Sequence, residues 1–140
     1  VLSGKMEDLS KIIELLKSNN IKNIKLPVSA PFHCKLMSKA TKIMKEEIKK
    51  IEFQEGKNKL ISNVTADEVS KKDDLKELLI DQIENRVRWR ESAIKMIDNN
   101  VNHFIEVGPG KVLSGLVKRI DKSVKINTIN SVTDIQELKI

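Results

Sequence analysis

The sequence of 140 residues is long enough for about one domain, and its single cysteine excludes a framework of internal disulfides. Charged residues make up 33% of the chain, and no apolar run approaches the ~20 residues that cross a bilayer, so we expect neither a membrane protein nor a fibrous one. A lone thiol suits the reducing cytoplasm, which is the predicted location. Because the chain begins with Val1 instead of methionine, we expect it to be a piece of something longer.

The charge is concentrated near the start of the chain. The first 50 residues hold 11 lysines and five acidic side chains, so they carry the whole net charge of +6. A nucleic-acid surface would place basic residues among stacking aromatic rings. Phe32 is the only aromatic residue in this region, and the lysines are scattered over helix-like faces. The pattern therefore predicts a solvated, lysine-rich surface and no nucleic-acid partner.

The first third of the chain alternates between strand and helix patterns. Residues 1–2 resemble the end of a strand, and apolar residues at helical spacing predict a helix over 6–16 that ends at Asn19-Asn20. Alternation over 24–28 then predicts a half-buried strand. A second amphipathic stripe predicts a helix over 36–48.

The remaining elements continue this alternation. In chain order they are a strand at 60–64, helices at 75–83 and 89–97, a strand at 104–107, a helix at 112–120 and a strand at 124–129. Strands separated by helices favour an α/β fold with some parallel pairing. The sequence has no internal repeat and no low-complexity linker.

Three groups of residues could carry chemistry. His33 and Cys34 are neighbours in an extended run, so their side chains point to opposite faces and cannot easily form a thiol–imidazole pair. We expect Cys34 to be a small packed residue, and from residue type alone His33 is either a capping or core histidine or a base. His33, Cys34 and His103 match no metal-ligand spacing, so no metal is predicted. His103 is expected to be structural.

The run Gly108-Pro109-Gly110-Lys111 resembles the end of a phosphate-binding loop. Such a loop needs a glycine five residues before the Gly-Lys pair and a serine or threonine after it, where this chain has Ile105 and Val112. We therefore expect a tight turn between strand and helix.

Two motifs together resemble a known family. "LPVSAPFHCKLM" at 26–37, followed by "EVGPGKVLSGLVKRI" at 106–120, closely resembles malonyl-CoA:acyl carrier protein transacylase. "LISNVTADEV", "DQIENRVRWRES" and the opening "VLSG" fall in the order that this family shows. The resemblance covers essentially the whole chain and corresponds to the C-terminal half of a transacylase.

The resemblance implies roles for four residues. His33 would be the general base that activates a serine nucleophile, and the backbone carbonyl of Gln82 would orient its ring, so that the side chain at Gln82 should matter little. Phe32 would crowd the substituent on the acyl α-carbon, and Asn63 would lie near the site as support. An imidazole, with a usual pKa of about 6.5, can accept and return a proton at neutral pH.

The resemblance also implies parts that this chain lacks. No GxSxG motif occurs, so the nucleophilic serine is absent, and the Gly-Gln-rich loop of the oxyanion hole and the arginine that binds the malonyl carboxylate would precede this segment. Taken alone, the chain should be inactive, because loss of one member of a catalytic triad costs ~10⁴-fold or more. No cofactor is implied: malonyl-CoA is a substrate, and the partners would be acyl carrier protein and the missing N-terminal half.

The implied architecture has two parts. Residues 1–29 would be the second half of a small ferredoxin-like subdomain, and residues 30–140 the C-terminal portion of a larger hydrolase-like α/β subdomain. The acidic carrier protein would suit the positive charge, with Lys118 and Arg119 as candidate contacts. Two other readings stay open. One is a non-catalytic binding module with a degenerate acyltransferase fold, and the other is an adaptor that binds nucleic acid or an acidic partner through the lysine-rich first third.

Overall fold

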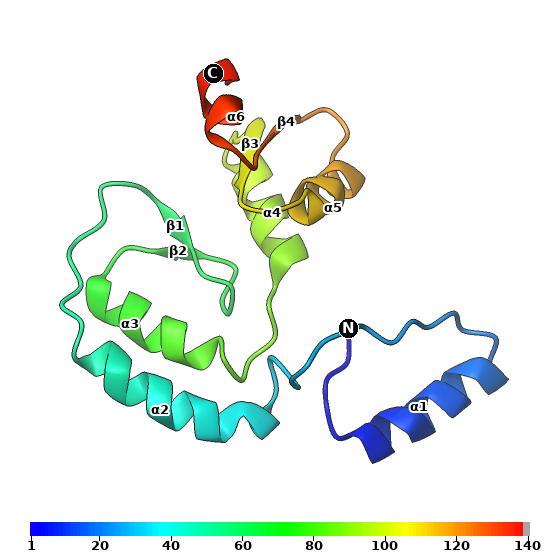
Figure 1. The fold of residues 1–140 in the computed structure, drawn as a ribbon. Coiled ribbons are helices and arrows are strands. Elements are labelled where there is room, and N and C mark those ends of the chain that lie inside the picture. The colour runs from blue at the N-terminus through cyan, green and yellow to red at the C-terminus, as the bar shows by residue number, and fades with distance from the viewer. Residues whose placement is uncertain (139–140) are drawn as a thin grey trace. The chain divides into compact units, whose positions relative to one another are not determined.

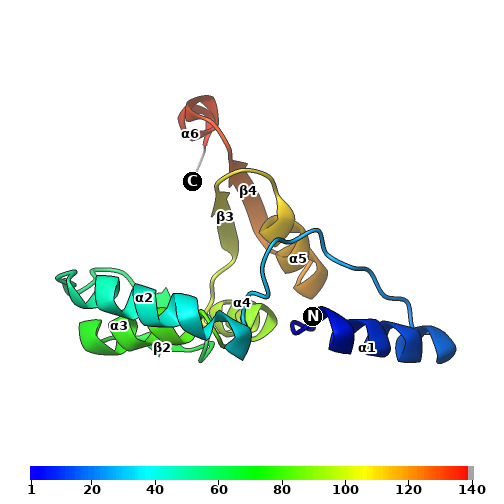
Figure 2. The ribbon, with the colours of Figure 1, turned by 60° about the horizontal axis from the view of Figure 1, so that its bottom comes forward.

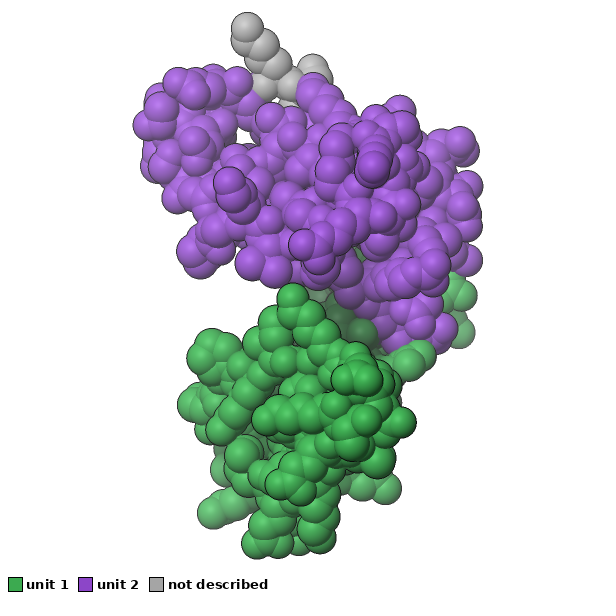
Figure 3. All heavy atoms as spheres, turned by 90° about the vertical axis from the view of Figure 1, so that its right-hand side faces the viewer, with its two compact units in different colours: residues 1–87 green, residues 88–140 purple. Residues whose placement is uncertain are grey.

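The computed structural model describes residues 1–138, and the chain divides into two compact units, Val1–Val87 and Arg88–Ile140. Figure 3 colours the two units separately, and each is described here by itself. Both units contain helices and short strands, and the two kinds of element alternate in the second unit, which agrees with the α/β class expected from the sequence. No helix in the described residues is long and apolar enough to cross a membrane. The subdomain boundary expected after residue 29 is a different division of the chain and stays a prediction.

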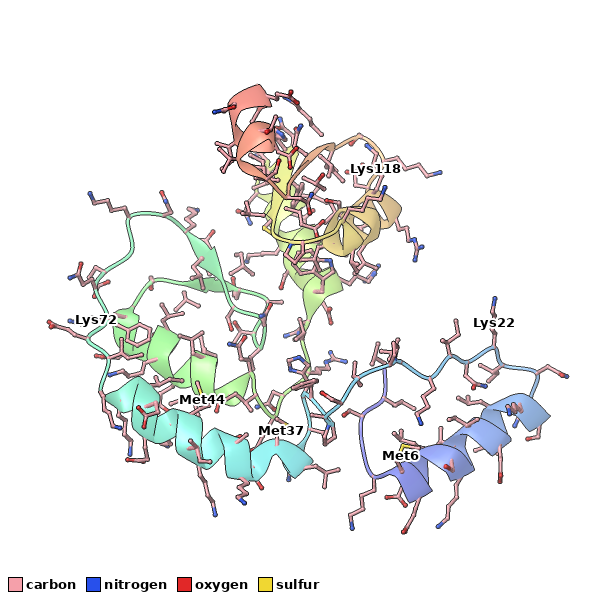
Figure 4. The ribbon with its side chains drawn as sticks, in the orientation of Figure 1. Met6, Lys22, Met37, Met44, Lys72 and Lys118 are labelled. Atoms are coloured by element: carbon pink, nitrogen blue, oxygen red, sulfur yellow. The ribbon has the colours of Figure 1, made fainter. Side chains whose placement is uncertain are left out.

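The first unit opens with one helix followed by an extended segment (Figure 1). Helix α1, Met6–Ser18, ends where expected, because Asn19 is its C-cap and Asn20 turns the chain with a φ of 57°. Figure 4 labels Met6 on this helix and Lys22 on the extended segment that follows. The predictions of strands at 1–2 and 24–28 are wrong: both segments are extended or irregular, and neither pairs with a strand of the described chain.

Two packed helices form the centre of the first unit. The short 3₁₀ turn η1, Lys35–Met37, leads into α2, Ser38–Lys49, which packs against α3, Lys72–Asp81 (Figures 1 and 2). Ile48 of α2 and Ile80 of α3 are the buried residues of this pair. Figure 4 labels Met37, the last residue of η1, and Met44 on α2. The Lys76 ammonium also lies 5.5 Å from the centre of the Phe53 ring, a cation–π distance.

A small antiparallel ribbon accompanies α3. Strand β1, Leu60–Ile61, pairs with β2, Glu68–Val69, so the strand predicted at 60–64 is shorter than expected and β2 was not predicted. The turn between them is closed by hydrogen bonds from the Ser62 amide to the Asp67 carbonyl, 3.0 Å, and from the Ala66 amide to the Ser62 carbonyl, 2.9 Å. Ser62 and Ala66 are both buried, which fixes the turn from inside.

The second unit is a strand–helix–strand unit with a helix at each end. Its elements are α4, Trp89–Asp98; β3, His103–Val107; α5, Val112–Ile120; β4, Lys125–Ile129; and α6, Val132–Glu137. Strands β3 and β4 are parallel, with His103 opposite Lys125 and Val107 opposite Ile129, and α5 is the crossover (Figure 1). The predicted parallel pairing is confirmed.

The core of this unit lies between the helices and one face of the sheet. Ala93, Val117 and Val124 are buried together. Partly buried side chains of α4, α5 and both strands surround them: Trp89, Ile97, Phe104, Ile120 and Ile126. Other apolar side chains stay in solvent, since Val107 is 75% exposed and Val112 72% exposed. A parallel sheet is normally covered on both faces, so the exposed apolar side chains mark surface that such a sheet usually buries.

Candidate active site

The bend that carries His33 is built from local hydrogen bonds. The Phe32 amide donates to the Ala30 carbonyl at 2.9 Å, and the Cys34 thiol donates to the Pro31 carbonyl at 3.2 Å. The Met37 amide then donates to the Cys34 carbonyl at 3.0 Å, which starts η1. The chain therefore turns sharply from the extended segment into the helices within a few residues.

His33 occupies an unusual backbone conformation at the centre of this bend. Its φ is 61°, in the left-handed region, which costs a residue with a side chain about 1–2 kcal/mol. Strain of this kind persists only where surrounding contacts hold it, and it is concentrated at functional sites. The conformation places the imidazole on the surface, where it is exposed.

The ring of His33 is held by the end of helix α3. Its Nδ1 lies 2.8 Å from the backbone carbonyl oxygen of Gln82. A carbonyl can only accept a hydrogen bond, so Nδ1 carries a proton, and in the neutral ring Nε2 then keeps its lone pair. The contact expected from the resemblance is thus present, and the ring has the tautomer that a base needs. That His33 acts as a base stays a prediction.

The position of Gln82 in the helix adds to this arrangement. Gln82 is the C-cap of α3, and its amide still donates to the Leu78 carbonyl at 3.1 Å. Carbonyl groups at a helix C-terminus have no partner in the helix and carry the negative end of its dipole. A hydrogen bond to such a carbonyl favours positive charge on the imidazole ring during proton transfer.

A third residue contacts this pair. Nδ2 of Asn63, in the turn between β1 and β2, donates to Oε1 of Gln82 at 3.0 Å. The structure therefore brings His33, Gln82 and Asn63 together from three separate segments. The side chain of Gln82, which sequence reasoning treated as unimportant, is part of the arrangement, and no signal in the sequence links two amides 19 residues apart.

Phe32 and Cys34 flank His33 without joining its hydrogen bonds. The Phe32 ring is 47% exposed, and its predicted part in acyl selection stays a prediction. Cys34 is half-buried; besides the Pro31 contact, its sulfur accepts a hydrogen bond of 3.6 Å from the Ser3 hydroxyl. The thiol is engaged with the backbone of the bend, as a packed structural residue would be.

The glycine-rich turn of the second unit is structural, as the sequence predicts. Gly108 and Gly110 have φ values of 135° and 94°, which side chains rarely adopt. The carboxylate of Glu106 accepts hydrogen bonds from the amides of Leu113 at 3.1 Å and Ser114 at 2.7 Å. Those amides are the free donors of the α5 N-terminus, so the carboxylate occupies the place that a phosphate would take.

The other histidine has a different setting. His103, at the start of β3, has its Nε2 2.8 Å from Oδ1 of Asn127 on the neighbouring strand. This contact fits the structural role expected for it. Within residues 1–138, no cluster of three histidine, cysteine, aspartate or glutamate side chains could hold a metal ion.

Comparison with known proteins identifies relatives over nearly the whole chain. No family model matches. The malonyl CoA-acyl carrier protein transacylase of Bacillus subtilis (strain 168) is 41% identical over 137 residues, which are 97% of this chain and 43% of that protein. The crystal structure of the transacylase of the same name from Clostridium perfringens matches with a TM-score of 0.88 and 36% identity, over 96% of this chain and 42% of that one.

A third match is to a complex. A structure described as a type II PKS acyl carrier protein bound to its malonyl-transacylase matches at 28% identity with a TM-score of 0.87, over 95% of this chain and 43% of that one. The chain thus spans less than half the length of the relatives that it matches. The predicted resemblance is confirmed: over nearly all of its length, this chain is homologous to part of the malonyl CoA-acyl carrier protein transacylases.

Proposed function

We propose that this chain supplies the general base, His33, for transfer of a malonyl group from CoA to acyl carrier protein in fatty acid synthesis. The observation that carries the proposal is the hydrogen bond of 2.8 Å from His33 Nδ1 to the Gln82 carbonyl, which leaves Nε2 unprotonated. Further support comes from the similarity of this chain to malonyl CoA-acyl carrier protein transacylases. The nucleophilic serine comes from a segment outside these 140 residues, since the chain has no GxSxG motif.

In the first half-reaction, Nε2 of His33 removes the proton of the serine hydroxyl as the oxygen attacks the malonyl thioester carbon. A serine hydroxyl is a weak nucleophile until a base takes this proton. The imidazolium then returns the proton to the departing CoA sulfur, and a malonyl-serine ester remains. The Gln82 carbonyl, at the negative end of α3, stabilises the ring while it is charged.

The second half-reaction uses the same groups in reverse. Nε2 takes the proton of the carrier protein's pantetheine thiol, whose sulfur attacks the malonyl ester. The serine oxygen leaves with the proton held by His33, and the malonyl group ends on the carrier protein. One histidine serves both halves, because an imidazole can accept a proton in one step and return it in the next.

The open surfaces of the chain fit assembly with a second segment. Both edges of the β3–β4 pair are unpaired within residues 1–138, and an unpaired strand edge is a template for another strand. Residues 1–29 then form half of a small ferredoxin-like subdomain and residues 30–140 part of the larger α/β subdomain. The partner segment also supplies the oxyanion donors and the arginine for the malonyl carboxylate.

Acyl carrier protein is the proposed macromolecular partner. Its negative charge suits a chain with a net charge of +6. Two basic residues near the end of α5 are candidate contacts, Lys118 and Arg119. The Lys118 ammonium, labelled in Figure 4, already donates to the Val124 carbonyl at 2.8 Å. Arg119 is exposed and makes no such bond, so it is the better candidate contact.

A segment exchange tests the function. The part of the Bacillus subtilis transacylase that matches this chain is replaced by residues 1–140, which gives a hybrid enzyme with both halves present. We expect the hybrid to transfer malonyl from malonyl-CoA to acyl carrier protein. His33→Ala should reduce the rate by ~10²–10⁴-fold, because the general base is lost.

The second histidine provides the matched control. His103→Ala removes an imidazole that is bonded to Asn127 in the other unit and should leave the transfer rate near that of the hybrid. Circular dichroism would establish that each variant is folded. A folded His33→Ala hybrid that transfers at the parent rate would contradict the proposal and favour a binding module with a degenerate acyltransferase fold.

A further inference from the structure

Asn63, Gln82 and His33 form a linear series of contacts. Asn63 Nδ2 lies 3.0 Å from Gln82 Oε1, and the Gln82 carbonyl oxygen lies 2.8 Å from His33 Nδ1. The two bonds use different parts of Gln82, its side chain and its backbone. Gln82 is therefore the link between a turn of the β-ribbon and the imidazole.

The Gln82 carbonyl lies just past the last hydrogen bonds of helix α3. The helix ends at Asp81, and the carbonyls of Leu78, Ile80 and Asp81 accept from amides of the four residues that follow. The Gln82 carbonyl comes after these bonds, where helices fray, so the direction that it keeps toward His33 depends partly on contacts outside the helix. Within the described residues, the side chain of Gln82 makes one hydrogen bond, the one from Asn63.

Asn63, in contrast, lies in a turn that several hydrogen bonds hold in place. The amides of Ser62 and Ala66 close this turn with bonds of 3.0 and 2.9 Å, and the Val64 amide donates to the Ser62 hydroxyl at 3.1 Å. Ala66 is buried and holds a φ of 58°, which packing has to maintain. The turn can therefore act as a fixed point for the amide of Asn63.

We propose that Asn63 is a positioning residue: by holding the side chain of Gln82, it fixes the carbonyl that keeps the proton of His33 on Nδ1. The proposal rests on the proposed function of His33. The direction of the amide–amide bond is not critical, since rotating both amides exchanges donor and acceptor and keeps the bond.

The consequence for chemistry lies in the tautomer of His33. An imidazole in water prefers its proton on Nε2, and a ring in that form has no lone pair on Nε2 for the serine proton. The Gln82 carbonyl reverses this preference. Loss of the Asn63 contact should let the carbonyl move and shift His33 toward the unreactive tautomer, whereas a contact that only stabilised the fold would leave the tautomer unchanged.

The test compares variants of the hybrid enzyme by ¹⁵N chemical shifts of the His33 ring and by the turnover number. Asn63→Ala and Gln82→Ala should each shift the ring toward the Nε2–H form and lower kcat about tenfold, the effect of losing one good hydrogen bond. The double variant should be no worse than either single one, because both remove the same contact. KM for malonyl-CoA should change little, since substrate binding is not involved.

Two further variants separate positioning from folding. Gln82→Glu keeps an oxygen that accepts from Asn63 and should retain the parent tautomer, read from the ring shifts. Asn85→Ala is the matched control, because Asn85 Nδ2 donates at 2.9 Å to the carbonyl of Asp81 at the same helix end without touching Gln82. It should leave both readouts unchanged.

The outcomes distinguish this inference from the proposed function. Parent-like His33 shifts in folded Asn63→Ala and Gln82→Ala hybrids would overturn the positioning role, whatever the rate. If Asn63→Ala does not fold, the contrast between Gln82→Ala and Gln82→Glu decides the matter. If His33→Ala leaves transfer intact, the proposed function fails, while the ring shifts still report whether Asn63 controls the tautomer.

Discussion

A main-chain carbonyl acts on a histidine differently from a carboxylate. A carboxylate fixes the tautomer of the ring and adds a full negative charge beside it, whereas the Gln82 carbonyl fixes the tautomer with only a dipole, strengthened by the end of α3. A carbonyl also cannot be removed by substitution, only displaced. This is why the residues that hold Gln82 in place matter for a site of this kind.

Cys34→Ser tests whether the thiol beside His33 has any part in the chemistry. A serine hydroxyl can donate to the Pro31 carbonyl as the thiol does, so the bend should persist. We expect the hybrid enzyme to keep most of its activity, with a mildly lower melting temperature because a hydroxyl replaces a small apolar group. Steady-state transfer rates and thermal unfolding measure the two effects. An inactive but folded Cys34→Ser hybrid would make Cys34 a candidate nucleophile instead.

Arg119→Ala tests the carrier-protein contact. Because the Arg119 side chain is exposed and makes no ion pair or hydrogen bond within residues 1–138, its loss should raise KM for acyl carrier protein and leave malonylation by malonyl-CoA unchanged. Lys118→Ala is the matched control, since that ammonium is bonded to the Val124 carbonyl; it should lower stability more than carrier-protein affinity. Equal effects of both variants on KM would remove the assignment to Arg119.

The sequence predicted part of the site but not all of it. The resemblance led to His33 and to the Gln82 carbonyl, and that contact is present at 2.8 Å. The positive φ of His33 could not be read from the sequence, because Pro-Phe-His-Cys contains no glycine to signal it. The Asn63–Gln82 bond depends on how two segments meet in space, and neither amide carries a pattern that predicts the other.

At the scale of elements, the turn from β3 to α5 shows how a strand can cap the helix that follows it. The N-cap residue of α5, Lys111, makes no side-chain cap, and the Glu106 carboxylate of β3 takes its place. Hydrogen bonds from Ser114, and then from Leu113, hold the pKa of Glu106 below its ordinary value of 4.5. The two glycines allow the chain to bend back far enough for this contact.

This cap predicts how the second unit responds to pH. A carboxylate with a lowered pKa in the folded state stabilises the fold fully above its ordinary pKa, and the effect is lost as the pH falls through the lowered value. Glu106→Gln should therefore lower the melting temperature at about pH 7, and this effect should shrink as the pH falls toward about 3, because Glu106 gains its proton as the pH passes the lowered pKa. Fluorescence of Trp89, the only tryptophan, reports on this unit.

Glu137→Gln is a suitable control for that experiment. Glu137 is exposed at the end of α6, so its loss should not change the melting temperature of the second unit at either pH. A Glu106→Gln chain that is as destabilised at about pH 3 as at about pH 7 would show that the carboxylate charge is not what supports α5.

Helices were easier to predict than strands, for a physical reason. Five helices follow from apolar spacing, because each helix satisfies its hydrogen bonds within one segment. The run 24–28 has the alternation of a strand but no partner in the described chain. Helix α6 was missed although Ser131 and Asp134 form a capping box, a signal that the sequence does contain.

At the scale of the whole molecule, the chain buries little. Among the described residues, six apolar ones are buried, and many large ones lie in solvent, among them Ile24, Val28 and Val107. Exposed apolar surface of this extent is typical of an interface with another chain or segment. The chain also spans less than half the length of the relatives that it matches.

The last prediction follows from the proposal that the base lies in this chain and the nucleophilic serine does not. The 140-residue chain contains the proposed base, His33, but no serine within GxSxG, so malonyl-CoA should not label it covalently. The measurement is intact-mass spectrometry after incubation with malonyl-CoA, run beside the hybrid enzyme, which should gain one malonyl group. The hybrid with His33→Ala should be labelled much more slowly, since serine attack then lacks its base. Stoichiometric malonylation of the 140-residue chain at one residue would mean that the nucleophile lies inside this segment, and the mapped residue would replace the external serine in the mechanism.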